Sequence, residues 1–100
     1  MNGSRKSKTS RTRNTPETRP VRFEYTAPKA GAVAIAGSFN DWRPHAMEQE
    51  VSGIWFAELQ LGPGRYEYRF IIDGRWVEDP QALEQAINPY GSANSVRLVG

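Results

Sequence analysis

Hydrophobic and polar residues alternate along most of the chain after residue 20, with the period of two that is typical of β-strands. The strands that this pattern predicts cover residues 21–25, 32–37, 55–61, 65–72, 75–78 and 95–99. The strand at 32–37 is apolar throughout, as expected of a strand covered on both faces. Residues 81–94 lack the alternation, and we expect a loop there, with at most one helical turn over residues 82–86.

Glycine and proline mark the turns between these strands. Gly62, Pro63 and Gly64 end one strand, and Asp73-Gly74 is the pair favoured in a two-residue hairpin, where both turn residues need positive φ. Parallel strands would need crossover helices, which the sequence lacks. The sequence therefore predicts an all-β protein, an immunoglobulin-like antiparallel β-sandwich.

The Asp73-Gly74 hairpin also sorts the aromatic residues by face, because directly opposed side chains share a face. The predicted pairs are Ile72 with Arg75, Ile71 with Trp76, Phe70 with Val77 and Arg69 with Glu78. The residues expected to face the core are Tyr66, Tyr68, Phe70 and Val77. Trp76 then lies on the opposite face, beside Arg69 and Ile71. Trp55 shares its face with Ala57, Leu59 and Leu61, which favours a place in the core.

Charge divides the chain into two parts. The total is +2, from 13 Lys+Arg and 11 Asp+Glu. Residues 1–20 hold six basic residues and Glu17, a balance of +5, and the other seven basic and ten acidic residues give residues 21–100 a balance of −3. Of the 38 apolar residues, Met1 alone lies in the first twenty. We expect a disordered basic tail over 1–20 and one β-sandwich domain over 21–100.

Several classes of protein are excluded or disfavoured by the composition. The chain has no cysteine, which excludes disulfides, thiolate catalysis and cysteine-based zinc sites. No apolar run is long enough for a membrane span or a signal peptide. We expect no cofactor and no metal, and a cytoplasmic location. Met1 and the basic tail favour a complete small protein, although a fragment would give the same domain.

Catalysis has little support in the sequence. His45 is the one histidine, and it lies beside Pro44 in a predicted loop. Asp41, Asp73 and Asp79 could provide the two carboxylates of a glycosidase, but the first two lie in turns and the third precedes a proline. We therefore expect a protein that is not an enzyme.

Two tryptophans lack an obvious place in the core and suggest a sugar-binding surface. Trp76 lies beside Arg69 on an outer sheet face, and Trp42 lies in a polar loop. Sugar rings stack their C–H faces on aromatic rings, and their hydroxyl groups need hydrogen-bonding partners at the edge. Such partners are available in the late loop, at Asn88, Tyr90, Ser92 and Asn94. The alternatives are that Trp76 packs under the loop at 81–94 and that Trp42 fills the end of the sandwich.

Several motifs resemble those of carbohydrate-binding module family 48. They are Gly37-Ser-Phe-Asn-Asp-Trp42, Gly53-Ile-Trp55, the segment from Leu61 to Trp76, Asp79-Pro80 and Asn94-Ser-Val96. This family includes the glycogen-binding domain of AMP-activated protein kinase beta subunits and the early-set domain at the N-terminus of isoamylases and branching enzymes. The resemblance covers about residues 21–99 and implies an early-set sandwich that binds α-1,4-linked glucan.

The resemblance also implies roles for individual residues. Trp42 and Trp76 would stack on glucose, and Arg69 takes the place of a lysine that contacts sugar hydroxyl groups. Tyr90 takes the place of a leucine that inserts into the glucan coil. Ser92 aligns with a threonine, and Asn94 aligns with an asparagine that hydrogen-bonds the sugar.

The leading hypothesis is therefore non-catalytic binding of an α-glucan, such as glycogen, starch or a maltooligosaccharide. The alternative is an interaction domain that docks to a glycogen-metabolising enzyme or a kinase and has a vestigial sugar site. A third reading gives the basic tail an affinity for nucleic acid or another anionic surface, and we expect no membrane partner.

Overall fold

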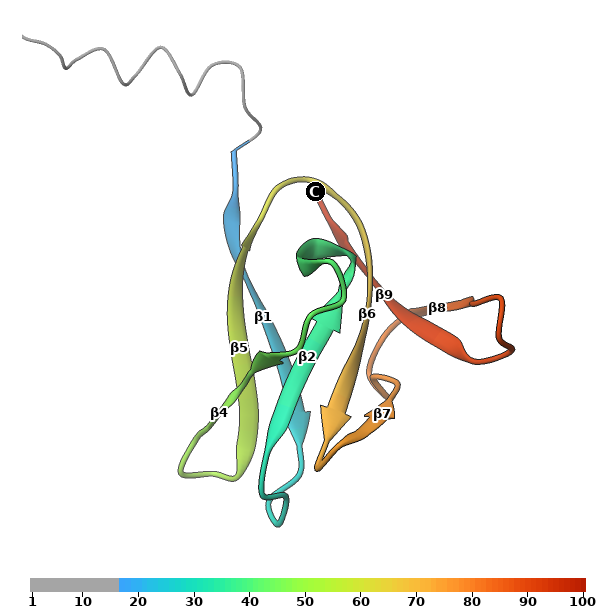
Figure 1. Ribbon diagram of the computed structural model, residues 1–100. Coiled ribbons are helices and arrows are strands. Elements are labelled where there is room, and N and C mark those ends of the chain that lie inside the picture. The colour runs from blue at the N-terminus through green and yellow to red at the C-terminus, as the bar shows by residue number, and fades with distance from the viewer. Residues whose placement is uncertain (1–16) are drawn as a thin grey trace, which may run out of the picture.

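The computed structural model describes residues 17–100. Most of the tail expected over residues 1–20, namely residues 1–16, lies outside the described residues. The described chain folds into two antiparallel sheets (Figure 1). The first sheet has the strand order β1-β5-β4 and consists of β1 (Arg19–Thr26), β4 (Glu48–Gln49) and β5 (Ile54–Leu61). The predicted all-β sandwich is confirmed.

The second sheet has six strands, in the order β3-β2-β6-β9-β8, with β7 paired to β6. They are β2 (Val33–Gly37), β3 (His45–Ala46), β6 (Gly64–Ile72), β7 (Arg75–Val77), β8 (Glu84–Ile87) and β9 (Ala93–Val99). A short 3₁₀-helix, η1 (Ser38–Asn40), follows β2. One edge of β6 pairs first with β9 and then with β7, while the opposite edge pairs with β2.

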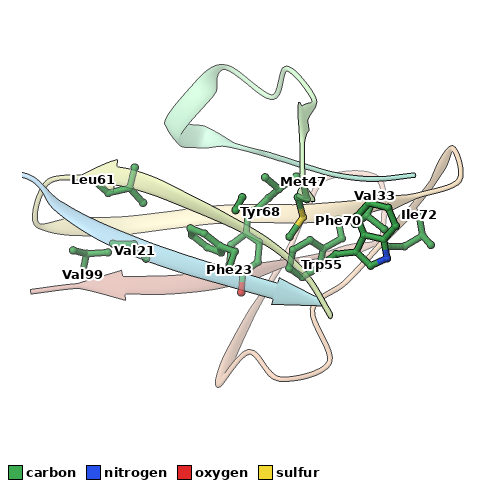
Figure 2. Close-up of a cluster of buried hydrophobic side chains, with 12 residues drawn as sticks. Val21, Phe23, Val33, Met47, Trp55, Leu61, Tyr68, Phe70, Ile72 and Val99 are labelled. Atoms are coloured by element: carbon green, nitrogen blue, oxygen red, sulfur yellow. The ribbon is translucent and has the colours of Figure 1, made fainter. Parts of the chain in front are cut away.

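Aromatic side chains fill the space between the sheets (Figure 2). Phe23 on β1 packs edge-on against Tyr68 on β6, with ring centroids 4.9 Å apart, and Tyr25 packs on Phe70 at 5.1 Å. Trp55 is 8% exposed and its indole N–H donates to the carbonyl of Ala27 at 2.8 Å. The predicted core placement of Trp55 is confirmed.

The hairpin at Asp73-Gly74 forms as the sequence predicts. Asp73 and Gly74 have φ of 48° and 87°, the positive values that this two-residue turn needs. Phe70 pairs with Val77, Ile71 with Trp76 and Ile72 with Arg75. The pairing ends at Val77, so the predicted pair of Arg69 and Glu78 does not continue the ladder. The Asp73 carboxylate accepts the N–H groups of residues 31 and 32, which ties the hairpin to the start of β2.

The prediction for residues 81–94 was wrong in part. Residues 82–86 form no helical turn, because Glu84–Ile87 is β8 and pairs with β9. The last strand also begins at Ala93, two residues before its predicted start. Residues 81–94 lack the alternation of a strand, so a loop was expected there. Pairing with β9 satisfies the backbone groups of Glu84–Ile87, and this pairing is decided by tertiary structure.

Candidate functional site

Trp76 lies on the outer face of the second sheet, away from the core. It opposes Ile71 on β6, and its side chain remains 43% exposed. The Arg69 guanidinium reaches the same place, since its Nη2 donates to the carbonyl oxygen of Trp76 at 3.3 Å. The face predicted for Arg69 and Trp76 is confirmed, and the exposure of Trp76 argues against the alternative in which the late loop buries it.

Arg69 is held from two sides. Besides Trp76, it contacts Ser92, with its Nη1 lying 3.5 Å from the Ser92 hydroxyl oxygen. Its Nε is buried and has no hydrogen-bond partner among the described residues. A buried donor without a partner costs on the order of 1–3 kcal/mol. The guanidinium is therefore fixed in direction and retains an N–H group that an oxygen acceptor would stabilise.

The turn between β8 and β9 positions Ser92 and exposes Tyr90. The Asn88 side chain accepts the backbone N–H groups of Tyr90, at 2.9 Å, and of Ser92, at 3.2 Å. Its Nδ2 donates to the Ser92 hydroxyl at 2.7 Å. Asn88 thus shapes this turn rather than offering its amide to a ligand. Tyr90 is left 93% exposed at the tip, where its ring is accessible from solution.

Asn94 is buried beside a residue that sequence reasoning did not select. Its Nδ2 donates to a carboxylate oxygen of Glu67 at 3.1 Å. This hydrogen bond, together with the neighbouring Arg65, lowers the pKa of Glu67 below its ordinary value. Alternation along β6 places Glu67 on the same face as Arg69, and that pattern could have identified it. Glu67 fixes the orientation of the Asn94 amide.

Trp42 extends from the loop that follows η1. Asp41 and Trp42 both have positive φ, 57° and 60°, which costs a non-glycine residue about 1 kcal/mol or more each. Asn40 stabilises this path, because its side chain accepts the N–H of Gly37 and donates to the carbonyl of Arg43. The side chain of Trp42 is 36% exposed, more than expected for a residue that fills the end of the sandwich.

The structure brings together some of the predicted site residues. Hydrogen bonds join Arg69 to Trp76 and Ser92, and Asn94 belongs to the strand beside them. Trp42 and Tyr90 come from two separate loops and take no part in those hydrogen bonds. The candidate site therefore consists of a fixed centre on β6, β7 and β9 and two exposed aromatic rings on loops.

The residues weighed for catalysis have other contacts. His45 is exposed on β3, opposite Ile35. Asp73 accepts two backbone N–H groups, and the buried Asp79 accepts the hydroxyl of Tyr68. Within residues 17–100, no group of three or more His, Asp or Glu side chains could hold a metal ion. No helix in that part of the chain is long and apolar enough to span a membrane.

An antiparallel sandwich that exposes a tryptophan beside a guanidinium on an outer sheet face has the architecture of a carbohydrate-binding module. A family model described as the glycogen recognition site of AMP-activated protein kinase matches residues 19–100. The chain belongs to this family, carbohydrate-binding module family 48, and the resemblance found in its motifs is confirmed.

Similar proteins include plant, bacterial and animal chains. Protein FLOURY ENDOSPERM 6, chloroplastic, of Oryza sativa subsp. japonica is 37% identical over 84 residues, which is 83% of this chain and 15% of that protein. The 1,4-alpha-glucan branching enzyme GlgB 2 of Xanthomonas campestris is 40% identical over 69% of this chain and 10% of the enzyme. The 5'-AMP-activated protein kinase subunit beta-1 of Sus scrofa is 33% identical over 64% of this chain and 51% of the subunit. This chain therefore spans only part of each relative.

Proposed function

We propose that the chain binds α-1,4-linked glucan, as in glycogen, starch or maltooligosaccharides, on the outer face of its second sheet and without catalysis. The observation that supports this most strongly is the pairing of an exposed Trp76 with a fixed Arg69. An indole that is 43% exposed offers a flat apolar surface to a sugar ring, and the guanidinium beside it offers donors to the ring's hydroxyl groups.

The proposal assigns a role to each residue around this centre. Trp42 and Trp76 stack on glucose units, and Arg69 and Asn94 hydrogen-bond to hydroxyl groups. Ser92 orients Arg69, and Tyr90 adds a third apolar contact from the turn before β9.

The affinity should be modest. An exposed platform exchanges well-solvated hydroxyl groups for a small number of contacts, and association itself is costly. If a glucose ring removes about 50 Å² of indole from water, each tryptophan contributes about 1.3 kcal/mol, a factor of about ten in the dissociation constant.

Titration with maltoheptaose or β-cyclodextrin, followed by tryptophan fluorescence for the parent chain and by amide shifts for all variants, tests the proposal. Trp76→Ala or Trp42→Ala should each weaken binding by about tenfold, and the double variant by about a hundredfold. Trp55→Phe is the matched control, because it removes the buried tryptophan and should leave the affinity unchanged. Unchanged binding by the folded double variant would contradict the site assignment.

A second candidate is suggested by the relatives, one of which is a kinase subunit and another a branching enzyme by name. In that case the domain docks to such a protein and its sugar site is vestigial. Failure to bind any α-glucan, together with recovery of a protein partner, would favour it. Amylase-type turnover by the purified chain would contradict the non-catalytic assignment. The cytoplasmic location and the division into a tail at 1–20 and a domain at 21–100 stay predictions.

A further inference from the structure

The two sheets are unequal, and the difference leaves one strand edge open. β1 pairs with β5 along all eight of its residues, from Arg19 to Thr26. Its other edge pairs with no strand among residues 17–100, because β1 ends the three-stranded sheet. The larger sheet extends past this edge with its last strands (Figure 1). The turn between β8 and β9 lies away from β1 and β5, whereas the end of β9 contacts β1 through Arg97.

The open edge presents backbone groups in a known direction. The carbonyl of Arg22 accepts a hydrogen bond from Nη2 of Arg97 at 3.0 Å, so it points away from β5 and towards β9. Backbone groups alternate in direction along a strand. The N–H and carbonyl groups of Glu24 and Thr26 therefore point the same way. Arg97 covers one carbonyl, and the N–H groups along the edge remain available.

A hollow lies along this edge. It has a volume of about 420 Å³ and is bounded by Arg22 and Glu24 of β1, the segment 79–84 and the end of β9, with Tyr68 among its lining residues. A second hollow of about 120 Å³ lies between the end of β1, at Glu24–Thr26, and residues 79–81. Leu83, on the far wall, is fully exposed. At about 3.3 Å per residue, an edge running from Arg22 to Thr26 accommodates about five residues of extended chain.

We propose that this groove binds an extended, basic segment of a partner protein, which adds to β1 as a fourth strand of the smaller sheet. Strand addition uses unpaired backbone groups for affinity and neighbouring pockets for side-chain selection, and the β1 edge offers both. The proposal concerns an edge between the sheets, whereas the glucan site lies on the outer face of the larger sheet. It therefore does not depend on glucan binding.

Charge favours a basic segment. Residues 17–100 hold eight basic and eleven acidic residues, a balance of −3. Arg22 is already paired with two carboxylates, those of Glu24 and Glu50, and Arg97 lies 4.4 Å over the ring of Phe23. The cationic groups of Arg22 and Arg97 are thus engaged within the domain, and so is the carboxylate of Glu24. The carboxylate of Glu84 also lines the hollow, where its side chain is 50% exposed and lies 3.6 Å from Arg65, so a lysine or arginine of the added strand would lie beside it.

A second copy of this domain is a poorer fit for the same edge. If two β1 strands paired with each other, the smaller sheets would join, with both larger sheets on one side of them. In each copy, the part of the larger sheet that extends past β1 would then overlap the same part of the other copy. A single extended segment avoids this clash.

The test uses a synthetic probe, the amidated and acetylated peptide Lys-Val-Thr-Val-Lys-Val-Thr. Binding to the full chain should shift the amide signals of Arg22, Glu24 and Thr26 in proton–nitrogen correlation spectra. Two versions of the peptide, N-methylated on alternate sets of residues, should differ, because only one set faces the β1 edge. One version should lose binding at least about tenfold, and the other should keep it. Equal binding by both versions would overturn strand addition.

Variants of the protein give an independent test. Glu24→Pro removes an N–H from the open edge and should weaken peptide binding at least about tenfold, whereas Glu24→Gln keeps the N–H and should weaken it only a few-fold. Ala82→Trp fills the hollow and should also abolish binding, which decides the matter if the proline variant does not fold. All three should bind maltoheptaose as the parent chain does. Unchanged peptide binding by the folded Ala82→Trp variant would refute the groove as the site.

The alternative occupants have their own outcomes. Residues 1–16 carry five basic and no acidic residues. If the peptide binds only after these residues are deleted, the chain's own N-terminal segment is the occupant and the partner proposal is overturned. Equal binding by the full and the shortened chain supports it. Peptide binding that depends on protein dimerisation, seen by light scattering, would contradict it.

Discussion

Loss of one buried hydroxyl group, in Tyr68→Phe, should destabilise the domain measurably. Tyr68 is 1% exposed, and its hydroxyl donates to a carboxylate oxygen of Asp79 at 2.5 Å. Asp79 is itself buried and holds the chain after β7, since its N–H donates to Ser95 and its other oxygen accepts the N–H of Gln81. Removing Tyr68's hydroxyl group leaves a buried carboxylate with one donor fewer.

The magnitude follows from the kind of bond that is lost. Hydrogen bonds to charged groups contribute about 1.5–3 kcal/mol, and the aromatic ring that packs on Phe23 and Phe70 is retained. We expect a loss of about 2 kcal/mol in the free energy of unfolding, which lowers the midpoint of urea unfolding by about 1–2 M. Tyr90→Phe is the matched control, because its side chain is exposed and should leave the midpoint unchanged.

The same group gives the stability a dependence on pH. Burial and the hydrogen bond to Asp79 raise the pKa of Tyr68 well above the usual value near 10. Above about pH 10 the unfolded chain releases this proton while the folded chain keeps it, so stability falls as the pH rises. Above about pH 10, the free energy of unfolding of the parent chain should fall by up to about 1.4 kcal/mol per pH unit more than that of Tyr68→Phe. Parallel alkaline unfolding curves, or a urea midpoint within about 0.5 M of the parent's, would refute this account.

Other substitutions test the site and the packing around it. Asn94→Ala removes the main cause of the lowered pKa of Glu67 and should raise that pKa towards its ordinary value, as measured by carbon NMR titration; an unchanged pKa would assign the shift elsewhere. Because the pKa of Glu67 is lower in the folded chain than in the unfolded chain, its carboxylate stabilises the fold at pH values above the unfolded-state pKa. This contribution should be lost as the pH falls through the folded-state pKa. Gly37→Ala places a Cβ 2.6 Å from the carbonyl oxygen of Glu67 and should lower the free energy of unfolding by about 1–3 kcal/mol, as measured by thermal unfolding. An unchanged unfolding temperature would contradict this close approach. Trp55→Phe removes the indole bond to Ala27 and should cost about 1–2 kcal/mol in urea unfolding, whereas a stability equal to the parent's would mean that this bond contributes nothing.

The alternation along the chain was sufficient to predict the central strands and the division of their faces. A period of two assigns every second residue of residues 65–72 to the core, and the Asp73-Gly74 turn fixes the register of the returning strand. Both are local properties, so Trp55 could be placed in the core and Trp76 outside it before any three-dimensional information.

Tertiary structure decided the parts that depend on neighbours distant in sequence. β8 exists because β9 satisfies its backbone groups, and residues 84–87 alone do not indicate which strand would pair with them. The burial of Asp79 and the contact of Glu67 with Asn94 likewise depend on strands that meet only in the fold.

The candidate site divides along the same line. Sequence by itself selected Trp42, Arg69 and Trp76 as candidate site residues that do not belong to the core. It also determined on which face of its hairpin Trp76 lies, because that face follows from turn chemistry and strand period. Only the tertiary structure decided that Ser92 meets Arg69, that Asn88 is used in shaping its turn and that the edge of β1 stays open. Those features arise from the packing order of the strands, a non-local property to which every pairing in both sheets contributes.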